Sequence, residues 1–249
     1  MSRVVTAIIF RETKTRFGKN KLGYFWALIE PSGYIGILLF LRYKMHASIP
    51  FGENIFLFVL TGLLMYRLFI SIADRCMSSI SSNQSLLTYP LVKPVDTILA
   101  RIILEVMTML AVILIFFSFL IFYTDYPVIN YPLDFCAAIA ATIFLGASVG
   151  VFNAVMSVVM PAWERVWGIS KLPTLFLSGI FYMPQSMPPA LQQILKWNPL
   201  LHCVEWLRQG SYLSYDPLLS KGFVLTCSLF IITFGLAIER RYRSILVRQ

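Results

Sequence analysis

Long apolar segments separated by short charged ones dominate the pattern of this chain. Six segments approach the roughly 20 mostly apolar residues that a membrane-spanning helix needs. They cover residues 22–43, 55–74, 98–123, 133–160, 168–183 and 222–239. The fourth is the clearest, since it is uncharged from residue 135 to residue 160, and the fifth is the weakest. The pattern predicts an all-α integral membrane protein with six transmembrane helices.

Residues 1–21 follow a different pattern. Val4, Val5, Ile8 and Ile9 fall on one side at helical spacing, and cations occupy the rest of the surface. This arrangement is typical of an amphipathic helix that lies in the interface of a membrane. Two roles stay open for it: contact with anionic lipid headgroups alone, or an additional role in docking a partner.

The segment before the last span is rich in proline and predicts two short helices. We expect them at about 188–197 and 199–212, with Asn198 as the N-cap and Pro199 as the first helical residue of the second. We expect both to be re-entrant, dipping into the outer leaflet. Irregular backbone at that depth must be buried in protein or line a cavity. This segment is therefore a candidate gate.

Composition narrows the class of protein. The chain is 58% hydrophobic and 13% charged, whereas soluble domains carry about 25% charged residues. The net charge of +9 does not indicate nucleic-acid binding, because the cations stand in short stretches between apolar segments. Fifteen lysines and arginines fall on the side that holds both termini and five on the other, with Arg67 inside the second span. The positive-inside rule then places both termini in the cytoplasm.

Motifs for catalysis are missing from the sequence. There is no phosphate-binding loop, no Gly-x-Ser-x-Gly, no His-Glu-x-x-His and no paired-carboxylate site. The four cysteines lie far apart, and neither histidine stands beside a cysteine or carboxylate cluster. We therefore expect no catalytic residue, bound cofactor or metal in this chain.

Glu30 is an unusual carboxylate inside the first apolar segment. Trp26, Glu30 and either Gly33 or Tyr34 share one helix face, because they are three or four residues apart. A carboxylate in hydrocarbon is costly, so Glu30 is expected to face protein or a water-filled path. A functional role is one reading. A structural role remains open, in which Glu30 caps the backbone freed by the following proline or pairs with Arg101.

Two spacings predict local packing. Arg101 and Glu105 are four residues apart at the start of the third span and are expected to form an ion pair. Gly146 and Gly150 form a Gly-x-x-x-Gly pattern in the fourth span. This pattern suits close helix packing, within one monomer rather than between two.

An apolar element at residues 86–92 interrupts the loop between the second and third spans. Pro90 and Pro94 frame this element, and the loop that holds it is expected to be cytoplasmic. An exposed apolar element needs a partner, and this one would fit the groove of a cytoplasmic protein as a short helix. The alternative is a loop that folds back on the lipid headgroups.

Three stretches together resemble a known family. They read "RETKTRFGKNKLGYFWALIEPSG", "NQSLLTYPLVKPVDTILARIILE" and "WNPLLHCVEWLR". In this order and spacing they are similar to the membrane permease subunits of capsular polysaccharide ABC exporters of Gram-negative bacteria, within the wider ABC-2 type permeases. The resemblance covers nearly the whole chain.

The resemblance implies a permease that works as a homodimer in the bacterial inner membrane, driven by a separate ATP-binding cassette ATPase. ATP and Mg would be bound by that partner, so this chain is expected to be a transport subunit and not an enzyme. Residues 1–21 would form the interfacial helix and residues 22–249 the permease domain. The cargo would be lipid-linked capsular polysaccharide, passed outward to a periplasmic co-polymerase or adaptor and an outer-membrane export protein, with membrane lipids as surroundings. The alternatives are an O-antigen or teichoic-acid type glycolipid exporter and, in another class, a membrane-embedded glycosyl- or acyltransferase.

The resemblance also implies roles for particular positions. A coupling helix at about 85–93 and the interfacial helix would contact the ATPase, through Arg11, Glu12, Arg16, Leu87, Tyr89, Pro90, Lys93 and Glu164. Periplasmic gate helices at about 187–212 would carry Trp197, Trp206 and Arg208. Aromatic faces hold sugar rings weakly at many positions, and the expected channel residues are Tyr24, Trp26, Glu30, Tyr34 and Tyr182. Capsule polysaccharides are usually acidic, and a carboxylate would repel them. Glu30 is therefore expected to hold the first-span kink or to organise the cytoplasmic mouth of the channel.

Overall fold

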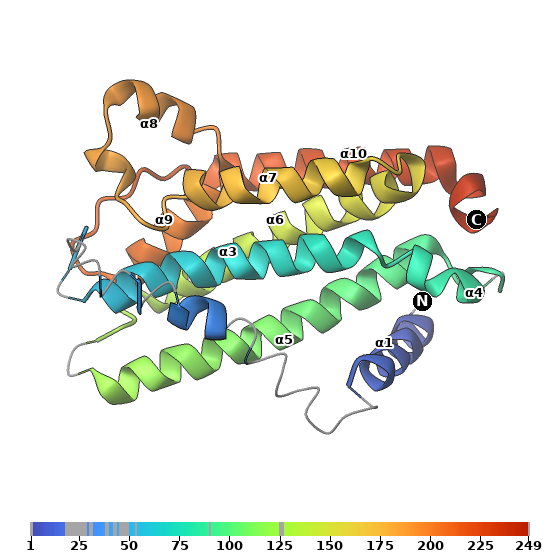
Figure 1. Ribbon diagram of the computed structural model, residues 1–249, viewed down its shortest axis with the longest axis horizontal. Helices are drawn as coiled ribbons and strands as arrows, with labels where there is room; N and C mark the ends of the chain where they lie inside the picture. The colour runs from blue at the N-terminus through green and yellow to red at the C-terminus, as the bar shows by residue number, and fades with distance from the viewer. Residues whose placement is uncertain are drawn as a thin grey trace.

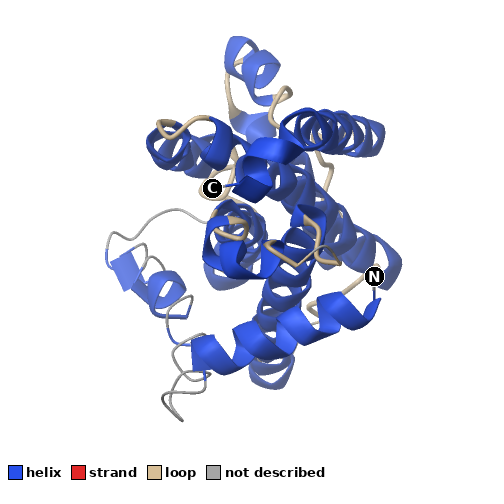
Figure 2. Ribbon diagram, turned by 90° about the vertical axis from the view of Figure 1, so that its right-hand side faces the viewer, coloured by secondary structure: helices blue, strands red, loops and turns tan. Residues whose placement is uncertain are grey.

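Four long helices form the body of the protein in the computed structural model, which describes residues 2–17, 29, 32–37, 40–41, 44, 50–52, 54–89, 91–124 and 127–248. They are α3 (Ile55–Met77), α5 (Pro94–Tyr123), α6 (Pro132–Val159) and α10 (Lys221–Arg248), and they run along the long axis of the molecule (Figure 1). All four are long and apolar enough to cross a membrane. The described residues contain helices, loops and turns but no strand (Figure 2).

The helix starts follow from local sequence. The side chain of Asn54 accepts a hydrogen bond of 2.8 Å from the backbone N–H of Phe56 and caps α3. Proline occupies the first turn of α5 and of α6, where its missing N–H costs nothing. The predicted spans at 55–74, 98–123, 133–160 and 222–239 coincide with α3, α5, α6 and α10, so these four predictions are confirmed.

The first and fifth predicted spans have different outcomes. Most of 22–43 lies outside the described residues, and its described positions are helical. The boundaries 168–183 are wrong, because the helix there is α7 (Trp163–Leu177). Its 15 residues extend about 22 Å, less than the roughly 30 Å hydrocarbon core. The chain leaves the helix at Ser178 and turns at Gly179, whose φ of 71° is the left-handed conformation that glycine favours.

Helix α3 lies at the centre of the bundle and is buried along most of its length. Helix α6 approaches it closely through Gly146 and Gly150. A Cβ atom at Gly150 would lie 3.0 Å from Cys76 Sγ, and one at Gly146 would lie 3.3 Å from Ile72 Cβ. The Gly-x-x-x-Gly pattern therefore packs two helices of one monomer, as predicted.

Short elements cover the two ends of the bundle. One end holds both chain termini, α1 (Ser2–Phe17), the 3₁₀ turn η1 (Ser81–Asn83) and α4 (Gln84–Leu87) (Figure 1). Figure 2 looks onto this end and shows the N-terminal helix lying across the long helices. The opposite end holds η2 (Pro184–Ser186), α8 (Pro189–Leu195) and α9 (Pro199–Ser211).

The start of α9 confirms the predicted cap. The side-chain oxygen of Asn198 accepts a hydrogen bond of 3.1 Å from the backbone N–H of Leu200, and Pro199 is the first helical residue. Helix α9 packs into the bundle, and nearly all of its side chains are buried. The re-entrant placement of α8 and α9 in a membrane stays a prediction.

Candidate functional site: the polar junction of α1, η1 and α5

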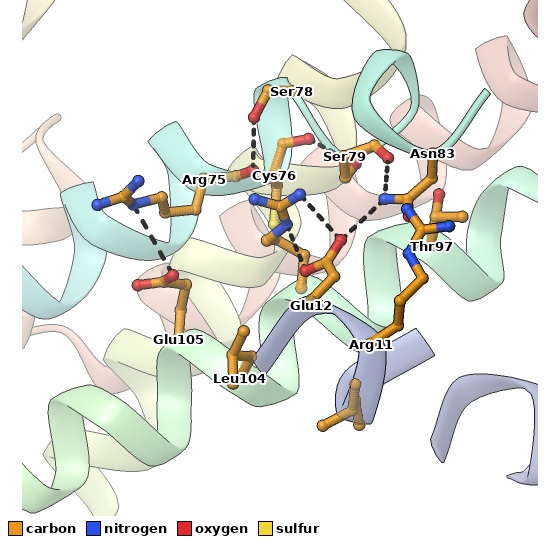
Figure 3. A network of polar contacts seen from close by, with 12 residues as sticks. Arg11, Glu12, Arg75, Cys76, Ser78, Ser79, Asn83, Thr97, Leu104 and Glu105 are labelled. Carbon is orange, nitrogen blue, oxygen red and sulfur yellow. Dashed lines mark hydrogen bonds and ion pairs between the residues drawn. The ribbon is translucent and has the colours of Figure 1, made fainter. Parts of the chain in front are cut away.

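A cluster of polar side chains joins three elements at the end that holds the termini. It consists of Arg11 and Glu12 from α1, Asn83 and the backbone carbonyl of Ser79 from the segment that follows α3 (Figure 3), and Arg101 from α5. We call these five residues the α1 junction. Residues 71 to 89 positions apart in the sequence meet here.

Glu12 is the centre of the α1 junction and is only 7% exposed. Arg101 Nη2 donates a hydrogen bond of 2.9 Å to Glu12 Oε1, and Arg101 Nε forms an ion pair of 2.8 Å with Oε2. Asn83 Nδ2 donates a further hydrogen bond of 2.8 Å to Oε1. A guanidinium that meets both oxygens of a carboxylate fixes the orientation of both groups. The pair therefore sets how α1 lies against α5.

Asn83 connects this pair to the loop. It is fully buried, and its amide nitrogen also donates to the Ser79 carbonyl at 2.8 Å. Its amide oxygen accepts from Arg11 Nη2 at 2.9 Å. Both polar atoms of the Asn83 side chain are thus hydrogen-bonded. Its amide oxygen and its amide nitrogen each hold η1 to α1. A displacement of η1 that keeps these bonds must move α1 with it.

A second pair lies beside the junction and corrects a prediction. Glu105 is 1% exposed, accepts a hydrogen bond of 2.8 Å from Ser71 Oγ and lies 3.8 Å from Arg75 Nε. The predicted ion pair between Arg101 and Glu105 is therefore wrong. Arg101 pairs with Glu12 on α1, because helix packing brings this carboxylate to it. Glu105 instead contacts Ser71 and Arg75 on α3, and Figure 3 shows it beside Arg75.

The apolar element at residues 86–92 is divided by the fold. Leu87 is 2% exposed and belongs to the hydrophobic core, so its prediction as an exposed contact for a partner is wrong. Tyr89 and Leu91 are 62% and 81% exposed. Lys93 is also exposed, and Pro90 lies outside the described residues. The helical part, α4, spans only Gln84–Leu87, so the predicted helix at about 85–93 ends early, where the chain turns at Thr88.

The other residues predicted to contact an ATPase occupy the same end. Arg11 and Glu12 belong to the α1 junction, and Glu164 is exposed in the first turn of α7. Arg16 lies in the last turn of α1, and its side chain is outside the described set. The structure thus brings Arg11 and Glu12 together with the loop, and it leaves Glu164 on the surface.

The predicted channel residues are described only in part. Tyr24, Trp26 and Glu30 lie outside the described residues. The ring of Tyr34 is half-buried, with the Arg67 guanidinium 5.0 Å from its centroid. Tyr182 donates a hydrogen bond of 3.0 Å to the Phe176 carbonyl, and partial burial raises the pKa of its hydroxyl.

The predicted gate residues differ strongly in exposure. Trp197 is 77% exposed, whereas Trp206 is 7% exposed and donates a hydrogen bond of 2.9 Å to Asp134 Oδ1. Arg208 is fully buried, with its guanidinium 3.6 Å from the centroid of the Phe58 ring. It donates to the Ile180 carbonyl at 3.0 Å and to Glu205 Oε1 at 3.2 Å. Arg208 therefore joins α9 to α3 and to the turn after α7, and its role in a gate stays a prediction.

Sequence reasoning missed the carboxylate that pairs with Arg208. Glu205 is fully buried and accepts hydrogen bonds from Tyr215 Oη at 2.7 Å, Gln185 Nε2 at 2.9 Å and the Leu218 amide at 3.1 Å. Burial raises the pKa of the Tyr215 hydroxyl. The signal for the pair was present, because opposite charges three residues apart on a helix are neighbours. Asn83 was also missed, and no sequence pattern marks it.

A further polar contact holds α7. The ammonium of Lys171 lies 2.7 Å from Asp74 Oδ2, and Trp167 Nε1 donates to the other oxygen of Asp74. Tyr66 Oη donates a hydrogen bond of 3.1 Å to the Lys171 carbonyl. No side chain of α7 is fully buried, and these polar contacts join it to α3. Among the described residues, no group of three histidine, cysteine or carboxylate side chains is placed to bind a metal.

Comparison with known proteins agrees with this architecture. The family description for ABC-2 type transporters matches residues 3–212. The polysialic acid transport protein KpsM of Escherichia coli is 35% identical over 238 residues, which cover 95% of this chain and 92% of that protein. The capsule polysaccharide export inner-membrane protein CtrC of Neisseria meningitidis is 28% identical over 248 residues, covering 96% and 91%. The O-antigen export system permease protein RfbA of Klebsiella pneumoniae is 21% identical over 230 residues, covering 90% and 88%.

Proposed function

This chain belongs to the ABC-2 type transporter family, and we propose that it is the permease subunit of an ATP-driven exporter of lipid-linked capsular polysaccharide. The observation that carries the proposal is the likeness to KpsM, a polysialic acid transport protein, across more than nine tenths of both chains. The bundle of four long apolar helices supports an inner-membrane location. The identity to an O-antigen permease is lower, at 21%, than the 35% identity to KpsM. This difference favours capsule polysaccharide over O-antigen as the cargo.

The proposed orientation places α1, η1, α4 and both termini in the cytoplasm. The bias of fifteen cations against five supports this assignment. Helices α8 and α9 then lie on the periplasmic side. The cargo enters at the end that holds the α1 junction and leaves beside α8 and α9, where a periplasmic co-polymerase or adaptor and an outer-membrane export protein receive it.

A separate ATPase supplies the energy and binds ATP and Mg. Its docking surface includes Tyr89 and Leu91, since large exposed apolar side chains in a soluble loop mark a protein interface. Lys93 and Glu164 are exposed and belong to the same proposed surface. Two copies of the chain form the channel between their first spans and their α7 helices.

Coupling follows from the α1 junction. Closure of the two ATPase subunits displaces the loop that holds Tyr89 and Leu91. Because Asn83 is bonded to Arg11 and Glu12, and Glu12 is bonded to Arg101, this displacement moves α1 and the start of α5 together. Glu12 and Arg101 are thus positioning residues, which act through the elements they join.

Co-purification with the ATPase tests the proposal. The tagged chain is solubilised in a mild detergent, and the bound proteins are identified by mass spectrometry. We expect an ATPase with the native chain, its loss with Leu91→Asp and its retention with Leu213→Asp. Leu213 is a matched control, because it is 67% exposed and lies beyond α9 at the opposite end. Leu87→Asp is unsuitable as a probe, since Leu87 is in the core.

Two outcomes would contradict the proposal. If no ATPase accompanies the native chain under any mild condition, this chain is not the permease of such an exporter, and transferase activity of the purified chain becomes the measurement to make. If Leu91→Asp and Leu213→Asp both retain the ATPase, the docking surface lies elsewhere and the coupling route through the α1 junction fails.

A further inference from the structure

A cavity of about 710 Å³ opens at the end of the bundle opposite the termini. It lies between the end of α8, the first turns of α9 and the segment that leads into α10. Figure 1 shows α8, α9 and the start of α10 at this end. Its volume is within the range of small-molecule sites.

His202 fixes the shape of this cavity. The side chain is 3% exposed, and its Nε2 lies 2.9 Å from the Lys196 carbonyl on one wall. Its Nδ1 lies 3.2 Å from the backbone nitrogen of Ser220 and 3.1 Å from the Leu218 carbonyl on the other wall. With the proton on Nε2, the ring donates to Lys196 and accepts from the Ser220 amide. Both walls are thus joined through one buried ring, and the cavity is formed before any ligand arrives.

Aromatic rings form one side of the cavity. Phe223 packs edge-on against His202, with ring centroids 5.4 Å apart, and against Trp197 at 6.2 Å. Trp197 is nevertheless 77% exposed. Its indole is therefore held at one edge, and most of its surface is left for a ligand. An indole face suits a sugar ring, whose axial C–H groups pack on the aromatic surface while its hydroxyls point sideways to polar groups.

Polar side chains surround the aromatic rings. Gln193, Lys196 and Ser220 line the cavity with an amide, an ammonium and a hydroxyl. Within the described part of the chain, none of these three side chains makes a hydrogen bond or ion pair. The cavity lining contains no carboxylate, so the ammonium of Lys196 gives it a positive potential. Donors and acceptors beside an aromatic face, with one cation, match an acidic sugar.

A second cavity has a mainly apolar lining. It has about 350 Å³, lies between α6, α7 and α10, and is lined mainly by apolar side chains that include Phe152, Phe230 and Phe234. Such a lining suits a lipid acyl chain. The cavity beside Trp197 instead offers hydrogen bonds on one side and an aromatic surface on the other.

We propose that the cavity formed by Gln193, Lys196, Trp197, Ser220 and Phe223 binds a short acidic segment of the exported polysaccharide on the exit side of the membrane. This inference rests on the proposed function and adds a substrate-binding site to it. The site holds the emerging chain weakly, through one indole face and one ammonium, and so hinders its return into the channel.

Tryptophan fluorescence tests the site in the full complex. The permease and its ATPase are placed in nanodiscs of phosphatidylcholine, and in a second set that also contains phosphatidylglycerol. Sialic acid tetramer and tetragalacturonate are titrated, with maltotetraose as the neutral control. We expect saturable binding of an acidic tetramer with a change in emission. Trp197→Ala, whose binding is measured by titration calorimetry because the reporting indole is removed, is expected to raise the dissociation constant at least about tenfold. Lys196→Gln is expected to remove the preference for acidic over neutral tetramer, and Trp163→Phe, in α7, to leave binding unchanged.

The outcomes separate the possible occupants. Failure of both acidic tetramers to bind, or binding unchanged in Trp197→Ala and Lys196→Gln, overturns the inference. A Trp197 emission that responds to phosphatidylglycerol in the nanodisc and not to the tetramers assigns the cavity to lipid headgroups and also overturns it. If the complex retains its ATPase and exports polysaccharide in these cases, the proposed function stands. Loss of the ATPase from the native chain would instead refute the proposed function.

Discussion

Removal of Arg101 from the α1 junction should release α1 from the bundle. The variant Arg101→Gln leaves the Glu12 carboxylate 7% exposed, with Asn83 as its remaining described donor. Breaking one side of a buried ion pair costs about 3–5 kcal/mol, because the remaining charge stays desolvated. The Arg101 side chain is itself 15% exposed, so we expect the lower value, about 3 kcal/mol.

Hydrogen exchange of the α1 amides measures this energy locally. A loss of about 3 kcal/mol in the opening free energy corresponds to roughly 150-fold faster exchange. Exchange in α10 should stay unchanged. The double variant Glu12→Gln with Arg101→Gln removes both charges. Its loss in the opening free energy of α1 should be smaller than the sum of the two single losses by about 2 kcal/mol. This difference distinguishes the pair from two independent contacts.

A surface pair provides the matched control. Lys221 Nζ lies 2.6 Å from Asp134 Oδ1, but the two side chains are 44% and 31% exposed. Solvent screens such pairs, so Lys221→Gln should change local exchange by less than about 1 kcal/mol. If Arg101→Gln has no larger effect than Lys221→Gln, or if the double variant is fully additive, the α1 junction does not hold α1 and the coupling route fails.

Three further predictions concern α9 and its neighbours. Gly210→Ala should lower the Tm sharply, since its Cβ would lie 2.6 Å from backbone nitrogen of α6, whereas Gly222→Ala, with open space around it, should not. Glu205→Gln should lower the Tm, since it leaves a buried arginine without its counter-charge. Burial raises the pKa of Cys203 to about 12, so its thiolate is scarce at pH 8. Maleimide should therefore label Cys203 only after unfolding, whereas it should label the exposed Cys136 in the folded protein. Equal labelling of both in the folded protein would contradict this burial.

The division of the apolar element at residues 86–92 changes how docking variants are interpreted. A charge at Leu87 enters the core and reduces folding, whereas a charge at Leu91 remains on the surface. Loss of a partner in a Leu87 variant would therefore report on stability and not on docking. The two leucines are four residues apart, and only the fold separates their roles.

The sequence by itself determined the secondary structure of the long segments. A helix satisfies its own backbone hydrogen bonds, so apolar runs of sufficient length become α3, α5, α6 and α10 in any apolar solvent. Local chemistry also determined the start of α9, because Asn198 caps within two residues. The left-handed turn at Gly179 could not be read from hydropathy, and the predicted fifth span was consequently too long at its end.

Only the tertiary structure decided which apolar faces meet protein and which charges pair. Lipid and protein interior are equally apolar, so hydropathy alone does not distinguish a lipid-facing helix from a buried one. The most apolar stretch of α3 is 78% buried inside the protein, and that of α10 is only 22% buried. Partner choice is equally non-local. Arg101 has Glu105 four residues away and pairs with Glu12, 89 residues away, because helix packing brings that carboxylate within 2.9 Å. The α1 junction exists only once α1, η1 and α5 have packed together.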